Sequence, residues 1–395
     1  MLYPPIDPNE RFRTRRAAAR RRKRLRRALA IAVLLGVVAA LGAGARLVGR
    51  EQAPAPDAPL AAVAPALPAP VEGPRPLPLE IRGVHVSIGL ASLPGKLEEY
   101  TALVDQGLTA IELDVKDESG HVGFVARGIP PLARRIGAAR EAYDVRDAVR
   151  EVRSRGLYLI GRVVVFEDPV LASARPELAV RRPDGSVWRD AAGLGWTNPY
   201  DRRVWKYNVD IAVAAARAGF DEIMFDYVRF PSDGEVGSAV FANPGRLGKR
   251  DVIPAFLRYA TRRLRPYDVR LSAAVFGLSA ARDLGIGQLP RRMAPYLDLI
   301  YPMTYPSHFG PGELGIENPT ASPGETVRRA LARFERRLAG HDVLVAPWVQ
   351  DFSFATRYGL EEVRAQIEAA RLSGAKGFLL WNAEGVYTEG ALSPS

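Results

Sequence analysis

No cysteine occurs among the 395 residues of this chain. That absence excludes disulfide bonds, thiol nucleophiles and cysteine-ligated metal sites. Histidine is also scarce, and the spacing of the four that occur is not typical of metal ligands: His85, His121, His308 and His341. The sequence also lacks a glycine-rich phosphate-binding loop after its first predicted strand. We therefore expect neither a metal nor a cofactor.

Acidic residues are nearly absent from the N-terminal end. Residues 1–27 contain eleven lysines and arginines against Asp7 and Glu10, which gives this tail a net charge of +9. The whole chain carries +11, so the remaining 368 residues are close to neutral. Clustered cations bind phosphate backbones, but here they form a short terminal block rather than a folded basic surface. This distribution argues against a nucleic-acid-binding protein.

An uncharged apolar run follows the basic block, from Ala28 to Ala45. Its length is near the lower end of the roughly 17–25 residues that span a bilayer, and the flanking positive charge favours a cytoplasmic N-terminus. We expect residues 28–48 to form a transmembrane segment behind a cytoplasmic tail of residues 1–27. Two fates stay open: a signal anchor retained in the membrane, or a signal peptide cleaved near residues 43–45, which would give a secreted protein.

The rest of the chain divides into a linker and one domain. Residues 49–80 are rich in proline and alanine and are expected to form an extended spacer outside the cytoplasm. Residues 81–395 have the size of one (β/α)₈ TIM barrel. Within them, eight short apolar runs are typical of strands that are buried on both faces of a parallel sheet. These predicted strands are Ile81–Ser87, Thr109–Val115, Leu157–Phe166, Phe220–Val228, Val269–Phe276, Leu297–Tyr301, Asp342–Val349 and Lys376–Trp381.

Amphipathic helical patterns separate the predicted strands. Several end at a glycine just before the next strand, as at Gly219, a position that favours a left-handed backbone conformation. This alternation indicates right-handed βαβ units that close a barrel, and an open doubly wound sheet is the alternative. Only fourteen residues follow Trp381, so we expect the eighth helix to be missing or short. The predicted helices are Pro94–Gln106, Asp144–Arg155, Tyr200–Ala218, Asp251–Leu264, Gln288–Tyr296, Glu325–Leu338 and Leu360–Leu372.

Carboxylates gather at the predicted C-terminal ends of the strands, where the active sites of TIM barrels lie. Asp114 is near the end of the second predicted strand, Asp226 is near the end of the fourth, and Asp351 follows the seventh. Two carboxylates on either side of a glycosidic bond can act as acid and as base or nucleophile, so these three are the candidate catalytic residues. The alternative for Asp226 is a structural ion pair with Arg229 or Arg162.

Aromatic and polar side chains at the same strand ends are candidates for sugar binding. Tryptophan and tyrosine at a barrel mouth are expected to keep one face in water, as a platform for a sugar ring requires. Lys116 is expected on the strand face shared by Glu112 and Asp114, where its charge would neutralise either acid. The candidate binding residues are Trp381, Trp348, Tyr301, Tyr305, Tyr227, Arg162, Arg229, Lys116, Gln350 and Asn382.

Three strand ends carry a family resemblance. The segments FDEIMFDYVRFPSDG around Asp226, IYPMTYPSHFG around Tyr301, and APWVQDF with FLLWN near the C-terminus resemble a widespread, uncharacterised bacterial family of proposed glycoside hydrolases. The resemblance covers about Arg82 to Tyr387 and implies a (β/α)₈ barrel with glycosidase activity. The family is expected to carry an aspartate at the position of Ala274.

The chain is also distantly similar to the family 18, chitinase-like glycoside hydrolases. Met303 and Tyr305 match the Met-x-Tyr of their sixth strand, and Trp381 matches the tryptophan of their eighth. Their catalytic glutamate falls at Val228, so the resemblance does not imply their substrate-assisted mechanism.

The residues and the resemblance together predict a hydrolase tethered to the cell membrane, with an extracytoplasmic barrel that acts on a polysaccharide or glycan. That glycan would belong to the cell envelope or to the extracellular space. Two alternatives remain. One is a carbohydrate-binding barrel without catalysis, and the other is an envelope scaffold, which would expose an apolar patch on its helices.

Overall fold

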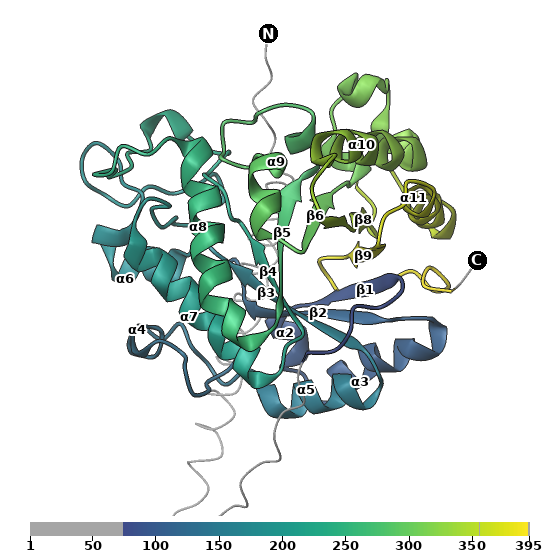
Figure 1. Cartoon of the computed structure of the whole chain (residues 1–395), viewed down its shortest axis with the longest axis horizontal. Helices are drawn as coiled ribbons and strands as arrows, with labels where there is room; N and C mark the ends of the chain where they lie inside the picture. The colour runs from purple at the N-terminus through teal and green to yellow at the C-terminus, as the bar shows by residue number, and fades with distance from the viewer. Residues whose placement is uncertain (1–73, 355, 394–395) are drawn as a thin grey trace, which may run out of the picture. The chain divides into compact units, whose positions relative to one another are not determined.

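The computed structural model describes residues 74–354 and 356–393 (Figure 1). The predicted cytoplasmic tail, the predicted transmembrane segment and most of the predicted linker lie outside these residues. Within the part that is described, no helix is both long enough and apolar enough to cross a membrane.

The described strands form one closed parallel sheet, with the helices packed around it (Figure 1). The strands are β1 (Ile81–Val86), β2 (Ala110–Lys116), β3 (Tyr158–Val164), β4 (Glu222–Asp226), β5 (Arg270–Phe276), β6 (Leu299–Met303), β7 (Leu344–Val345), β8 (Trp348–Gln350) and β9 (Gly377–Trp381). Their order is β5-β4-β3-β2-β1-β9-β8-β6-β7, and a pairing of β5 with β6 closes the ring. β7 and β8 are two pieces of the one strand predicted at Asp342–Val349, so the nine segments correspond to eight barrel strands. The predicted (β/α)₈ barrel is confirmed.

The helices follow the predicted alternation with some differences. They are α2 (Ile88–Ala91), α3 (Lys96–Thr101), α4 (Pro131–Arg135), α5 (Val145–Ser154), α6 (Pro169–Ala174), α7 (Arg202–Ala218), α8 (Lys249–Leu264), α9 (Pro290–Met293), α10 (Pro323–Leu338) and α11 (Leu360–Leu372). The first predicted helix is shorter than expected, because a 3-10 turn at Ala102–Gln106 takes its second half. α7 ends at Gly219 with φ 110°, as predicted. Up to Ser393, no helix follows β9.

Apolar side chains fill the space between the strands and the helices. Val84, Ile111, Leu159 and Ile223, from four neighbouring strands, are fully buried, which explains why these strands read as continuous apolar runs. Inside the ring, by contrast, several strands contribute polar side chains that are also buried: His85, Glu112, Arg162, Glu222 and Ser272. A buried polar group is costly unless it is hydrogen-bonded, so this interior layer needs partners.

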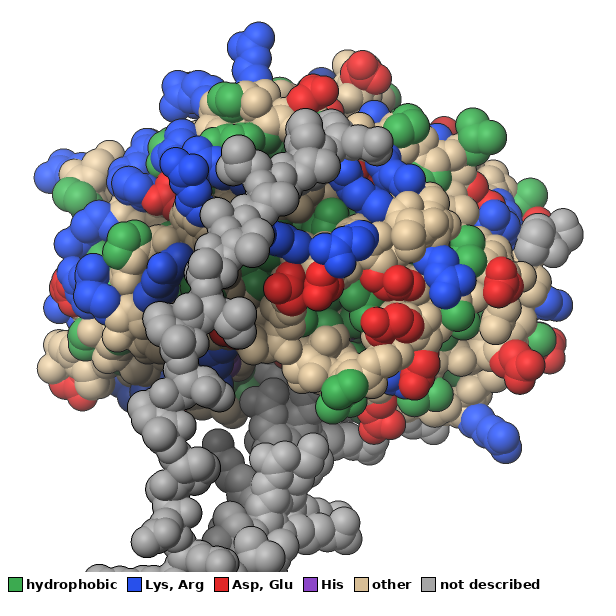
Figure 2. Space-filling view, turned by 90° about the horizontal axis from the view of Figure 1, so that it is seen from below, with side chains coloured by type: hydrophobic (Ala, Val, Ile, Leu, Met, Phe, Trp, Pro, Cys, Tyr) green, Lys and Arg blue, Asp and Glu red, His purple; other side chains and the backbone are tan. Residues whose placement is uncertain are grey.

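The loops after β3 and β4 are long and are joined to each other. Trp188, in the loop after β3, donates from Nε1 to the carbonyl oxygen of Glu235, in the loop after β4, at 3.0 Å. On the face in Figure 2, lysine and arginine side chains reach the surface together with aspartate and glutamate. The folded part is therefore not a uniformly basic body.

Candidate active site

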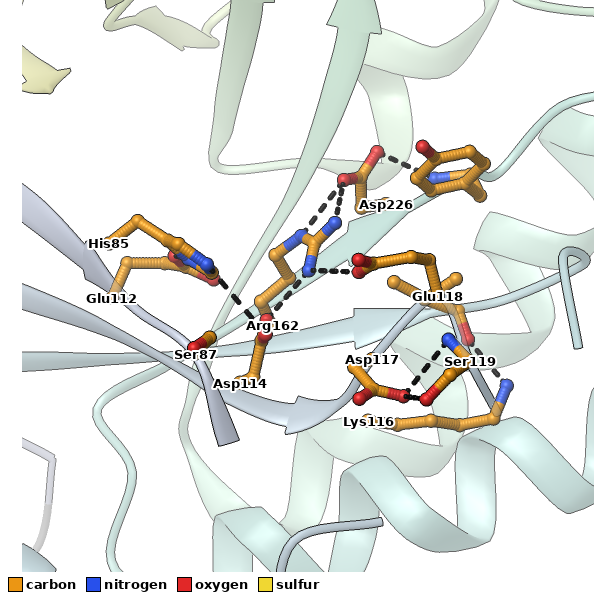
Figure 3. A network of polar contacts seen from close by, with 12 residues as sticks. His85, Ser87, Glu112, Asp114, Lys116, Asp117, Glu118, Ser119, Arg162 and Asp226 are labelled. Carbon is orange, nitrogen blue, oxygen red and sulfur yellow. Dashed lines mark hydrogen bonds and ion pairs between the residues drawn. The ribbon is translucent and has the colours of Figure 1, made fainter. Parts of the chain in front are cut away.

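Arg162 lies at the centre of the polar layer and joins two of the predicted catalytic residues (Figure 3). Its Nη1 is 2.6 Å from Oδ1 of Asp114. Its Nε and Nη2 lie 2.9 and 2.8 Å from Oδ2 of Asp226. The three residues come from the adjacent strands β2, β3 and β4, where Asp114 is paired with Arg162 in the sheet register. One guanidinium therefore holds both carboxylates, each at most 5% exposed.

Asp226 is further fixed by the backbone beyond it. The amide N–H of Tyr227 donates to Oδ1 of Asp226 at 2.6 Å. Tyr227 has φ 49°, an uncommon backbone conformation for a tyrosine. Such strain persists where the surrounding structure fixes it, and it is frequent at functional sites.

Asp114 is a buried carboxylate of this site whose pKa lies above its ordinary value. Burial raises the pKa of Asp114 to about 6, and the positive charges of Arg162 and His85 oppose that shift. Glu118, in the loop after β2, adds to the rise in the pKa of Asp114, and its Oε2 lies 3.7 Å from Nη1 of Arg162. The Glu118 side chain is 20% exposed, so it is the acidic group of this cluster that solvent reaches most easily.

His85 and Glu112 form a pair beside Asp114. The parallel register of β1 and β2 places them opposite each other, and Nδ1 of His85 is 2.5 Å from Oε2 of Glu112. Nε2 of His85 faces Oδ2 of Asp114 at 3.7 Å. Burial alone would lower the pKa of His85, but the carboxylates of Glu112 and Asp114 raise it above its usual value.

These three residues are also the described group that comes nearest to a metal site. His85, Glu112 and Asp114 offer ligand atoms that all lie within 4.8 Å of one another. The two ring nitrogens of His85, however, face different carboxylates, and the guanidinium of Arg162 already contacts Asp114. The arrangement fits a hydrogen-bonded His85–Glu112 pair beside an Asp114–Arg162 ion pair better than a shared cation.

The expected position of Lys116, on the face of β2 that carries Glu112 and Asp114, is wrong. The register between β2 and β3 shifts between Asp114 and Lys116, so this bulge turns Lys116 away from the face that it was expected to share. Its Nζ donates to the carbonyl oxygen of Val164 at 2.7 Å and lies 2.9 Å from Oδ2 of Asp168. Arg162, rather than Lys116, supplies the positive charge next to Asp114.

Trp381 is the predicted sugar platform that lies against the site. Its ring is 4.4 Å from the His85 ring, with an angle of 34° between the planes, and 5.6 Å from the guanidinium carbon of Arg162. Trp381 is partly exposed, as a platform requires. Trp348 packs edge-on against it at 5.5 Å and is only 2% exposed.

The two predicted tyrosine platforms do not have the expected wet face. Tyr301 is fully buried within the barrel, near Glu222, a carboxyl whose pKa burial raises to about 7. Tyr301 lies in the middle of β6 rather than at its end, because the strand continues to Met303. Tyr305 is 2% exposed and packs edge-on against the His308 ring.

Asp351 is bound to the C-terminal segment. The backbone N–H and the hydroxyl of Thr388 donate to its two carboxylate oxygens at 2.8 and 2.5 Å. Its backbone carbonyl accepts from the Asn382 amide at 2.6 Å. Gln350 likewise joins two loops, because its Oε1 accepts from the N–H of Ser307 while its Nε2 donates to the carbonyl oxygen of Phe352. These contacts fix loops around the barrel mouth.

Arg229 lies in an aromatic cage. Its guanidinium carbon is 4.9 Å from the ring centre of Trp196, 5.0 Å from that of Tyr227 and 4.7 Å from that of Phe276. Arg162, the other partner considered for Asp226, makes the ion pair with that carboxylate.

Comparison with known proteins places the chain in a family. The family model for "Putative glycosyl hydrolase domain" matches residues 83–387. A crystal structure of a hypothetical protein from Ruminiclostridium thermocellum ATCC 27405 is 37% identical with a TM-score of 0.44, over 48% of this chain and 96% of that one. The PgaB (BpsB) glycoside hydrolase domain from Bordetella bronchiseptica is 15% identical with a TM-score of 0.57, over 78% of this chain and 95% of that one.

Among curated proteins, none matches the chain. The likeness to the Bordetella domain shows a shared barrel fold, and the family model covers almost the whole described part. The predicted family resemblance is thus confirmed, and the chain belongs to this glycosyl hydrolase family.

Proposed function

We propose that the barrel hydrolyses a glycan of the cell envelope, with Asp114 as the general acid and Asp226 as the base or nucleophile. The observation that carries this assignment is the bridge through Arg162, which holds the two carboxylates on either side of one planar group. Glycosidases place their two carboxyl groups roughly 5–9.5 Å apart across the scissile bond.

The two carboxylates have environments suited to different roles. With its pKa raised to about 6, Asp114 keeps its proton in mildly acidic solution and can deliver it to the leaving sugar oxygen. Asp226 accepts hydrogen bonds from Nε of Arg162 and from the N–H of Tyr227 and lies 2.8 Å from Nη2 of Arg162, so a fixed cation and a fixed amide hold the proposed base or nucleophile in place. In hydrolysis one water is consumed: its hydroxyl goes to the anomeric carbon and its remaining proton restores the acid.

Trp381 supports the binding of a sugar ring beside this pair. Its partly exposed face lies next to His85 and Arg162, so a ring stacked on it would lie near Asp114. Asp351, the third predicted catalytic residue, is assigned to holding Thr388 and the C-terminal segment, because both of its oxygens accept hydrogen bonds there.

The envelope location rests on the N-terminal sequence. The basic tail of residues 1–27 before the apolar run at 28–48 favours a barrel outside the cytoplasm, at the end of a proline- and alanine-rich spacer. Protease added to spheroplasts should remove the barrel. Protection of the barrel from protease would contradict this location.

The activity is tested with the full-length protein on a panel of envelope and plant glycans, with new reducing ends as the readout. Wild type should cleave at least one glycan, and Asp114→Asn and Asp226→Asn should not. If wild type cleaves none of the panel, or if both variants cleave as fast as wild type, the proposal fails.

A further inference from the structure

A basic pocket lies on the outer wall of the barrel, between α8, α9 and α10 and the 3-10 turn Gly277–Ala280 that follows β5. Its volume is about 310 Å³, at the low end of the roughly 300–1,000 Å³ range of small-molecule sites. Five arginines and one carboxylate line it: Arg250, Arg282, Arg291, Arg292, Arg337 and Asp283.

The carboxylates nearby do not balance this charge. Three of the arginines form ion pairs, which are Arg250 with Asp283 at 2.7 Å, Arg292 with Asp251 at 2.6 Å, and Arg282 with Glu313 at 2.8 Å. Five arginines against three carboxylates leave an excess of two positive charges. Within the described residues, no carboxylate forms an ion pair with Arg291 or Arg337, and Arg337 makes only a backbone contact, from Nε to the carbonyl oxygen of Ala280 at 3.2 Å.

The pocket is connected to the barrel mouth through β5. The turn that carries Ser279 begins directly after Phe276, the last residue of β5, and Phe276 packs under the guanidinium of Arg229 at 4.7 Å. Active sites of TIM barrels lie at these strand ends. The pocket therefore borders the turn that leaves the barrel mouth after β5.

We propose that this pocket binds a phosphate group carried by the glycan substrate. The planar guanidinium fork matches the oxygens of phosphate, and Arg291 and Arg337 bring charge that no carboxylate of the described residues neutralises. Leu289 and Pro290 supply an apolar wall against which the adjoining sugar can pack. That the ligand is a glycan rests on the proposed function. That it carries a phosphate group rests on the pocket alone.

The test measures binding without turnover. Full-length protein carrying Asp226→Asn is titrated with phosphorylated dextran and with unmodified dextran. We expect at least tenfold tighter binding of the phosphorylated polymer, and competition by inorganic phosphate. Adding Arg291→Ala and Arg337→Ala should reduce the preference to less than twofold. Both positions are exposed, so the melting temperature should not change.

The matched control is the pair Arg333→Ala and Arg336→Ala. It removes the same charge from exposed positions on α10 that do not line the pocket, and it should keep the preference. Equal binding of both dextrans, or an equal loss in the control pair, would overturn the inference. A second result would also overturn it: the pocket substitutions abolish binding to phosphatidylglycerol vesicles but leave the preference for phosphorylated dextran intact. The phosphate bound by the pocket would then belong to a lipid.

Failure of the phosphate-site inference can be distinguished from failure of the proposed hydrolase function. Hydrolysis of neutral glycans without any preference for phosphate would reject the pocket inference and leave the enzyme assignment standing. If wild-type protein prefers the phosphorylated polymer but cleaves no glycan, the enzyme assignment is rejected and the phosphate site remains supported.

Discussion

Nδ1 of His85 and Oε2 of Glu112 are 2.5 Å apart, inside the barrel, and the other ring nitrogen of His85 faces Asp114 at 3.7 Å. The imidazole therefore lies between two carboxylates and makes a third contact with the tilted ring of Trp381. Because His85 lowers the pKa of Asp114 while Glu112 raises it, this pair adjusts the proton affinity of the proposed acid.

The first prediction concerns the pH dependence of hydrolysis. Burial raises the pKa of Asp114 to about 6, and a general acid works only when it is protonated. The value of kcat/KM should therefore decline as the pH rises above about 6, tenfold for each pH unit. A profile that stays flat up to pH 8 would remove Asp114 from the role of acid.

Two substitutions should move that decline in opposite directions. His85→Gln removes a positive charge that lowers the pKa of Asp114, so the decline should shift to higher pH. Glu118→Gln removes a negative charge that raises the same pKa, so the decline should shift to lower pH. A merely structural role for His85 or Glu118 would lower the rate or the stability without moving the pH of the decline.

A second prediction concerns the buried ion pair of Lys116 with Asp168. Both side chains are fully buried, and Lys116→Met would leave the carboxylate without its cation. We expect a loss of roughly 3–5 kcal/mol in the free energy of unfolding, measured by urea denaturation. The double variant Lys116→Met with Asp168→Asn should recover part of it. Lys96→Met, at an exposed pair with Glu99, is the control and should cost less than about 1 kcal/mol.

Lys116 shows which features of the site could be predicted from the sequence and which could not. The strands were predictable because continuous apolar runs follow from burial on both faces, and Asp114 and Asp226 were predictable from their places at strand ends. A strict alternation of side chains then put Lys116 beside Asp114. The bulge after Asp114 breaks that alternation, and nothing in the sequence of β2 signals it.

His85, Glu112 and Glu118 were missed as site residues for a related reason. His85 and Glu112 are separated by 27 positions in the chain and meet only because β1 and β2 pair in this register. The one sequence signal for their contact was that both residues lie on strands predicted to be neighbours in a parallel barrel. Tyr301 was misplaced because the predicted strand stopped there, whereas β6 runs on to Met303.

A third prediction concerns the seam between the first and last strands. Gly377 has φ 141°, and a Cβ added there would lie 2.0 Å from the carbonyl oxygen of Ile81. Gly377→Ala should therefore push β9 away from β1 and cost roughly 2–5 kcal/mol of unfolding free energy. Gly374→Ala is the matched control, since its φ of 69° is also positive but nothing lies within 4 Å of the added atom. It should cost about 1 kcal/mol. Equal melting temperatures for the two variants would contradict the close approach.

The last prediction separates an enzyme from a binding module, and it concerns Asp226. Asp226→Asn keeps the shape of the side chain but removes the charge that the proposed base or nucleophile needs. Turnover should fall by roughly 10²–10⁴-fold while the affinity for the glycan stays within a few-fold, because the lost interaction is specific to the transition state. Turnover, affinity and melting temperature should be measured on the same preparations.

Trp381→Ala is the companion variant, because it removes the stacking face and leaves both carboxylates in place. In an enzyme it should weaken binding more than Asp226→Asn does, while turnover at saturating glycan is reduced less. In a barrel that only binds, wild type and both variants leave the glycan intact, and only the affinity differs. If Asp226 has a purely structural role, Asn lowers stability and activity together, since Arg162 then keeps only Asp114 and Glu118 as acidic partners. Full activity in Asp226→Asn would remove that residue from the proposed mechanism.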